Sequence, residues 1–99
     1  MNPWSLPKDR QIRRLLVTLN ERLGDACDVA PEDSDDPRAV TLYRPDLPDL
    51  RAHIHLHGQR AGTFGLFLEY PHPVPGILES EDNLSLPRAL SCLALHFDA

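Results

Sequence analysis

The sequence predicts an α+β fold in which an N-terminal helix, a three- to four-stranded antiparallel meander and a C-terminal helix follow one another. Apolar residues recur at helical spacing near both ends of the chain and alternate with polar residues in its middle. The chain has 99 residues, which leaves room for a single hydrophobic core. Two amphipathic helices and a sheet with one apolar face must bury one another, so both helices are expected on one sheet face.

The first helix is predicted over residues 6–23. Ser5 is placed to cap it, Pro7 falls in its first turn and Gly24 ends it. Its apolar stripe consists of Ile12, Leu15, Leu16, Leu19 and Leu23. Residues 25–37 follow as an acidic loop with two prolines, and we expect a solvated connection there. Counted from Asp28 or Asp33, it lacks the glycine at the sixth position and the glutamate at the twelfth that a calcium-binding loop needs.

Three strands are predicted over residues 39–44, 51–57 and 63–70, because apolar and polar side chains alternate in each. A turn centred on Arg60 would place Arg51 opposite Glu69, a favourable cross-strand charge pair. A proline-rich loop is predicted over residues 71–76, and residues 76–79 are a candidate short fourth strand. The second helix is predicted over residues 86–97, with Ser85 as its cap.

Charge is divided unevenly along the chain. Residues 1–24 hold five basic and two acidic side chains, whereas the remainder holds five arginines and thirteen acids, for a net charge of −5. This acidic excess argues against nucleic-acid binding, although Arg10, Arg13 and Arg14 form a local basic stripe. The chain has no run of about 20 apolar residues and no leader-like segment, so we expect no membrane association. Its two cysteines, Cys27 and Cys92, fit a reducing compartment, and we expect a cytoplasmic protein.

Three histidines alternate along the second predicted strand, where His53, His55 and His57 would all point away from the helices. Tyr43 and Phe67 are expected beside them, and exposed aromatic side chains are typical anchors of protein interfaces. The leading interpretation is a small non-catalytic interaction module, an adaptor or an acidic neutraliser of a basic partner. A homodimer formed through the same face is also consistent with this pattern.

The alternative from another class is a metal-binding protein, with zinc held by His53, His55 and Glu69. Histidines two positions apart on a strand lie on one side, and Glu69 would lie diagonally across the predicted hairpin. Enzymatic activity is not expected, because the chain has no nucleophile elbow and no glycine-rich phosphate loop. Cys27 lies in acidic surroundings that disfavour a thiolate, and Cys92 falls near the buried stripe of a helix.

The segment from Tyr70 through Pro71 to Pro75 resembles the YPxxxP signature of RWD domains, which are non-catalytic relatives of ubiquitin-conjugating enzymes. The order of a helix, a meander and a final helix is similar as well. The resemblance implies a protein-interaction scaffold. Apart from the zinc of the alternative interpretation, no cofactor is expected. His72-Pro73-Val74 lacks the asparagine of the conjugating enzymes' motif, so conjugating activity is not implied.

Overall fold

A computed structural model describes residues 2–71 and 78–98 and confirms the predicted α+β fold class. Its antiparallel sheet has five strands in chain order, β1 to β5. The strands are β1 (Asp28–Val29), β2 (Ala39–Arg44), β3 (Leu47–His55), β4 (Phe64–Glu69) and β5 (Leu78–Leu84). The helices are α1 (Arg10–Leu23) and α2 (Leu86–Phe97), with short 3₁₀ helices η1 (Pro3–Ser5) and η2 (Gly24–Ala26).

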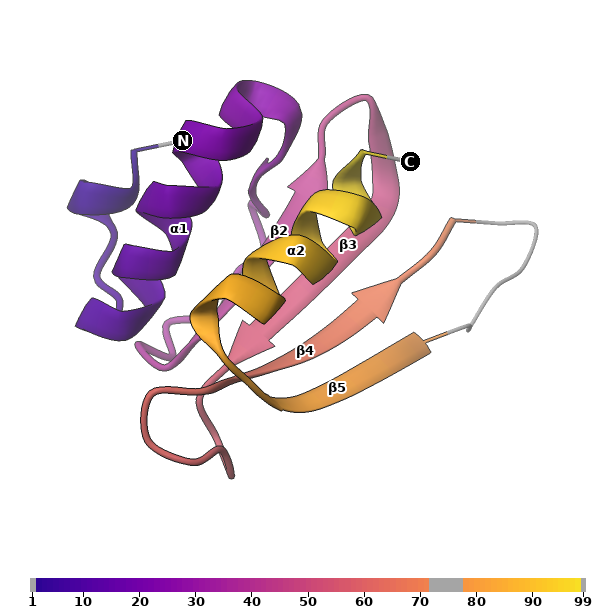
Figure 1. The fold of residues 1–99 in the computed structure, drawn as a ribbon. Helices are drawn as coiled ribbons and strands as arrows, with labels where there is room; N and C mark the ends of the chain where they lie inside the picture. The colour runs from indigo at the N-terminus through magenta and orange to yellow at the C-terminus, as the bar shows by residue number, and fades with distance from the viewer. Residues whose placement is uncertain (1, 72–77, 99) are drawn as a thin grey trace.

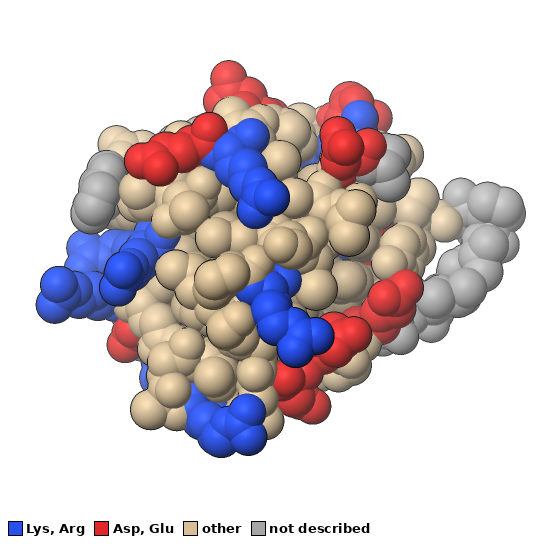
Figure 2. All heavy atoms as spheres, in the orientation of Figure 1, with Lys and Arg blue, Asp and Glu red and all other residues tan. Residues whose placement is uncertain are grey.

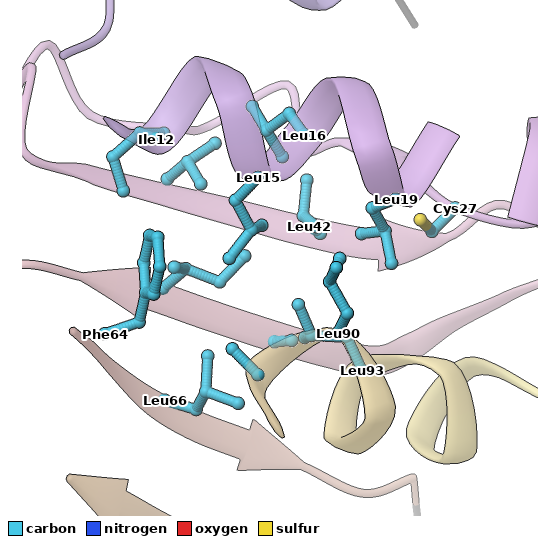
Figure 3. Packing of buried hydrophobic residues seen from close by; sticks show 14 of the residues in the cluster. Ile12, Leu15, Leu16, Leu19, Cys27, Leu42, Phe64, Leu66, Leu90 and Leu93 are labelled. Atoms are coloured by element: carbon cyan, nitrogen blue, oxygen red, sulfur yellow. The ribbon is translucent and has the colours of Figure 1, made fainter. Parts of the chain in front are cut away.

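Both helices pack on one face of the sheet, as expected from their amphipathic patterns (Figure 1). The stripe of α1 and that of α2 meet the inward-facing side chains of β2, β3 and β4 in one hydrophobic cluster (Figure 3). Leu15 and Leu93 contribute from the helices, and Leu42, Ile54 and Leu66 from the strands; all are fully buried. Burial of this apolar area is the main stabilising contribution to the two-layer arrangement.

The predicted register between the second and third predicted strands is confirmed. Arg51 lies opposite Glu69 and Ala52 lies opposite Leu68 across β3 and β4. Because side chains alternate between the two faces of a strand, this register places His53 and His55 on the face away from the helices. The candidate contact residues of these strands are therefore positioned by the pairing that buries the core.

The start of the first helix was predicted wrongly. α1 begins at Arg10, and its cap is Asp9, whose side chain accepts a hydrogen bond from the Gln11 N–H. Ser5 instead ends η1, and its hydroxyl donates to the Asn2 carbonyl. Lys8 lies between η1 and α1, and its side chain is held by an ion pair with Asp33. The helix therefore starts about one turn later than the sequence pattern indicated.

The strand boundaries also differ from the prediction. β3 starts earlier, at Leu47, because the turn uses only Pro45 and Asp46, and it ends at His55 rather than at residue 57. Leu47 pairs with Arg44, but Arg51 pairs with Tyr43, so residues 48–50 form an irregularity in the ladder. This irregularity carries Leu50 into the core.

Two strands lie where a loop or only a short strand was predicted. The acidic segment contains η2 and β1, and β1 pairs with the far edge of β2. β5 is longer than the predicted residues 76–79, since it runs from Leu78 to Leu84. The predicted third strand is slightly shorter, ending at Glu69, and the second helix agrees with its prediction over 86–97. Most of the proline-rich loop, including Pro75, lies outside the described residues.

A buried lysine holds the acidic segment in place. The Lys8 ammonium forms an ion pair with Asp33 at 2.9 Å and donates to the carbonyls of Ser34 and Asp36, each at 2.9 Å. Asp33 also accepts a hydrogen bond from the Thr41 N–H of β2. Complete pairing offsets the cost of burying this charge. Within the described residues, no helix is both long enough and apolar enough to cross a bilayer.

Candidate functional site

The outer face is the sheet surface opposite the helices, carried chiefly by Tyr43, His53, His55, Phe67 and Glu69. Backbone pairing aligns Thr41, His53 and Phe67 in one row across β2, β3 and β4, and aligns Tyr43, Arg51 and Glu69 in the next. The Phe67 side chain is 42% exposed, whereas Tyr43, His53 and His55 are half-buried. The structure therefore places four of the five predicted contact residues on the strands of this face, and the fifth, His57, reaches it from the turn after β3.

A chain of hydrogen bonds crosses three strands of the outer face. The Thr41 hydroxyl lies 3.0 Å from His53 Nδ1, and His53 Nε2 lies 3.2 Å from a carboxylate oxygen of Glu69. With Glu69 ionised, Nε2–H donates to the carboxylate and Nδ1 accepts from the threonine. The two contacts fix the orientation of the imidazole, which makes this part of the surface rigid.

Three rings stack along the same face. His55 lies between His57 and Phe67, with centroid separations of 6.3 Å and 5.4 Å and interplanar angles of 14° and 24°. The His55 ring covers Gly65, where any β-carbon would collide with it. His57 was predicted on the strand, but it lies in the turn after β3. It reaches the stack from that turn, and its Nε2 lies 2.6 Å from Asp36.

Acidic side chains surround the outer face. Asp36 pairs with His57, Glu32 forms an ion pair with Arg51, and Asp82 accepts a hydrogen bond from Gln59. The predicted pairing of Arg51 with Glu69 is thus replaced by two others, Arg51 with Glu32 and His53 with Glu69. The backbone N–H of Arg38 and the side chain of His57 both hydrogen-bond Asp36 and lower the pKa of its carboxyl group.

The arrangement needed for the metal hypothesis is not formed. Within residues 2–71 and 78–98, no three His, Cys, Asp or Glu side chains are grouped so that they could hold a metal ion. Glu69 is bonded to His53 directly, while the His55 ring turns toward Gly65 and Phe67. A shared ligand position between His53, His55 and Glu69 would require these contacts to break.

The cysteines are free thiols in different surroundings. Cys27 is buried against the core, and this burial, together with the nearby Asp28 charge, raises its pKa to about 11. A thiol with so high a pKa is a poor nucleophile at neutral pH. Cys92 is half-buried on α2.

One polar residue of the core, His96, was not predicted from the sequence. His96 on α2 is 4% exposed, and its Nε2–H donates to the Arg51 carbonyl of β3 at 2.7 Å. Burial lowers the pKa of His96, although the bond to that carbonyl and the nearby Glu79 act in the opposite direction. Its position on the helical stripe, one residue before Phe97, was the available signal. Histidine is intermediate in its tendency to be buried, so this position on the stripe did not by itself predict a buried side chain.

Comparison with known proteins found no match to this chain among family models, curated proteins or solved structures.

Proposed function

We propose that this chain is a non-catalytic protein-interaction module whose outer face binds a basic partner protein. The observation that carries the proposal is the exposure of Phe67 at 42% on a sheet face that neither helix covers. Large aromatic side chains at the centre of a surface supply much of the binding energy in protein complexes. The stacked His55 ring and the bonded His53 hold the surroundings of Phe67 in a fixed shape.

Charge supports a basic partner. Glu69 lies on the outer face, Glu32, Asp36 and Asp82 contact Arg51, His57 and Gln59 beside it, and the chain carries a net charge of −5. An acidic rim attracts a positively charged surface during encounter and disfavours acidic competitors. The acidic neutraliser and the adaptor remain two forms of the same proposal, since both place a basic protein on this face.

The resemblance to RWD domains at Tyr70 and Pro71 points to the same class of interaction scaffold, and we propose no enzymatic activity or cofactor. We also place the protein in the cytoplasm, because its two cysteines are free thiols, which is typical of a reducing compartment.

The test compares two truncations on opposite layers of the molecule. The immobilised chain is used to capture proteins from a cell extract, and each captured protein is then titrated against the wild type, Phe67→Ala and Leu95→Ala. Leu95 is the matched control, because it is 78% exposed but lies on α2. We expect to capture a basic protein. Phe67→Ala should weaken its binding free energy by about 2 kcal/mol or more, whereas Leu95→Ala should bind it as the wild type does.

Two outcomes would overturn the proposal. One is that no captured protein distinguishes Phe67→Ala from Leu95→Ala. The other is that sedimentation of the purified chain shows self-association that Phe67→Ala abolishes, which would identify a second copy as the occupant of the outer face.

A further inference from the structure

A hollow of about 580 Å³ lies along the solvent side of α1, in the helical layer and away from the outer face. The described residues that line it are Asp9, Arg10, Gln11, Arg13, Arg14, Val17 and Thr18. The volume is within the range of small-molecule sites, which is about 300–1,000 Å³. Figure 2 shows basic side chains gathered where Figure 1 places η1 and α1.

The arginines of this hollow have no acidic partners among the residues that the structure describes. Within the described part of the chain, the guanidinium groups of Arg10, Arg13 and Arg14 form no hydrogen bond or ion pair. Arg13 is half-buried, and its Nε is shielded from solvent without an acceptor. The guanidinium groups therefore have donors that no protein acceptor uses, and a bound anion would supply acceptors for them. Three unpartnered guanidinium groups around one hollow distinguish it from an ordinary solvated helix face.

The spacing of the arginines favours a compact anion. Arg10, Arg13 and Arg14 are at positions i, i+3 and i+4, so their β-carbons are neighbours on the helix surface, with a rise of about 6 Å from first to last. One pair of linked phosphates can contact all three guanidinium groups at that separation. Asp9 is the only acid among the described lining residues, and one of its carboxylate oxygens already accepts from the Gln11 N–H.

We propose that this hollow binds a phosphorylated small molecule, with its phosphates among Arg10, Arg13 and Arg14. Guanidinium groups match phosphate oxygens in geometry, and each can donate two parallel hydrogen bonds. Val17 and the methylene groups of the arginine side chains provide an apolar surface for the organic part of the ligand. A long nucleic acid fits less well, because it would extend past the stripe over a chain whose remaining charge is strongly negative.

The test is calorimetric titration of the full chain with three probes: inorganic pyrophosphate, ATP and adenosine. We expect ATP and pyrophosphate to bind, ATP more tightly, and adenosine to bind far more weakly than either. Added salt should weaken the binding of both ATP and pyrophosphate. Arg13→Gln and Arg14→Gln should each weaken ATP binding by about tenfold or more.

Arg22→Gln is the matched control, since Arg22 is an exposed arginine of the same helix outside the hollow. It should leave ATP affinity unchanged, and thermal unfolding of each variant verifies that the fold is retained. The proposal is overturned if neither phosphate probe binds, or if Arg22→Gln weakens binding as much as Arg13→Gln does. Binding of a duplex DNA or a polyglutamate peptide in preference to ATP would also overturn it. None of these outcomes bears on Phe67, so this proposal and the proposed function fail separately.

Discussion

At the scale of single residues, the outer face depends on the absence of a side chain. Gly65 is buried directly beneath the His55 ring, and a β-carbon there would collide with Cε1 and Nε2 of that ring. The side chain of Gln59 also approaches the same position. Glycine thus allows His55 to lie flat against the sheet, parallel to Phe67, in place of projecting into solvent.

This packing predicts that Gly65→Ala is destabilising and that a second substitution reverses much of the loss. We expect Gly65→Ala to lower the free energy of unfolding by about 1–3 kcal/mol, because the imidazole must leave its place. In the double variant His55→Ala/Gly65→Ala the collision is removed, so the two effects should be strongly non-additive. Urea unfolding of the wild type, both single variants and the double variant measures this coupling. Simple additivity would contradict the overlap of His55 with Gly65.

Individual side chains were predictable where the strand pattern alone decides their direction. His53 and Phe67 face outward as expected, because alternation fixes the face once the core side is known. Glu69 was expected near His53, as part of a metal site, and the two side chains contact each other directly. The partner of Arg51 was not predictable, because Glu32 reaches it from a segment that was interpreted as a loop. Such pairings depend on tertiary positions that periodicity does not encode.

At the scale of elements, the N-terminus of α1 shows how two equivalent cap signals can compete. Ser5 and Asp9 are both favourable capping residues, and Pro7 is compatible with either interpretation. The structure selects Asp9, since Lys8 must turn back toward Asp33 and a helix starting earlier would prevent this. The choice between the two caps therefore depends on a contact with a distant segment.

The two candidate caps make opposite predictions. Asp9→Ala should lower the free energy of unfolding by about 1 kcal/mol, because the Gln11 N–H loses its acceptor and a negative charge leaves the helix N-terminus. Ser5→Ala should have an effect within about 0.5 kcal/mol, since its hydroxyl makes only an exposed bond to the Asn2 carbonyl. Chemical denaturation of both variants decides between them. A larger loss for Ser5→Ala would show that the helix starts where the sequence pattern placed it.

Strand β5 was underestimated for a different reason. Its centre reads Glu79-Ser80-Glu81-Asp82, a composition with little intrinsic preference for strands. Pairing with β4 nevertheless extends it from Leu78 to Leu84, so tertiary contacts override local preference. The charged side chains also suit its position at the sheet edge, where they oppose pairing with other chains.

At the scale of the whole molecule, one buried histidine joins the two layers. His96 belongs to α2, and its Nε2–H bonds the Arg51 carbonyl on the central strand β3. Its ring also packs edge-on against Tyr70 and Phe97. Burial lowers the pKa of His96, and this effect is larger than the opposing effect of the Glu79 charge, which raises it. The net result is a histidine that is held neutral between the helical layer and the sheet.

Stability should therefore fall as the solution becomes mildly acidic. The pKa of His96 is lowered from 6.5 in the folded chain, so the unfolded chain takes up the proton first as pH falls. The contribution of neutral His96 to the free energy of unfolding is fully present above about pH 6.5. Below that pH it declines, by at most about 1.4 kcal/mol per pH unit for a single group. Asp36 does not interfere, because its lowered pKa places its own loss of stabilisation below pH 3.8.

The measurement is urea unfolding between pH 5 and pH 8 for the wild type and His96→Gln. Glutamine keeps an N–H donor for the Arg51 carbonyl but does not titrate, so the variant should unfold with a shallower pH dependence than the wild type. An equal slope in the wild type and His96→Gln would mean that the link between α2 and β3 is not the source of acid sensitivity.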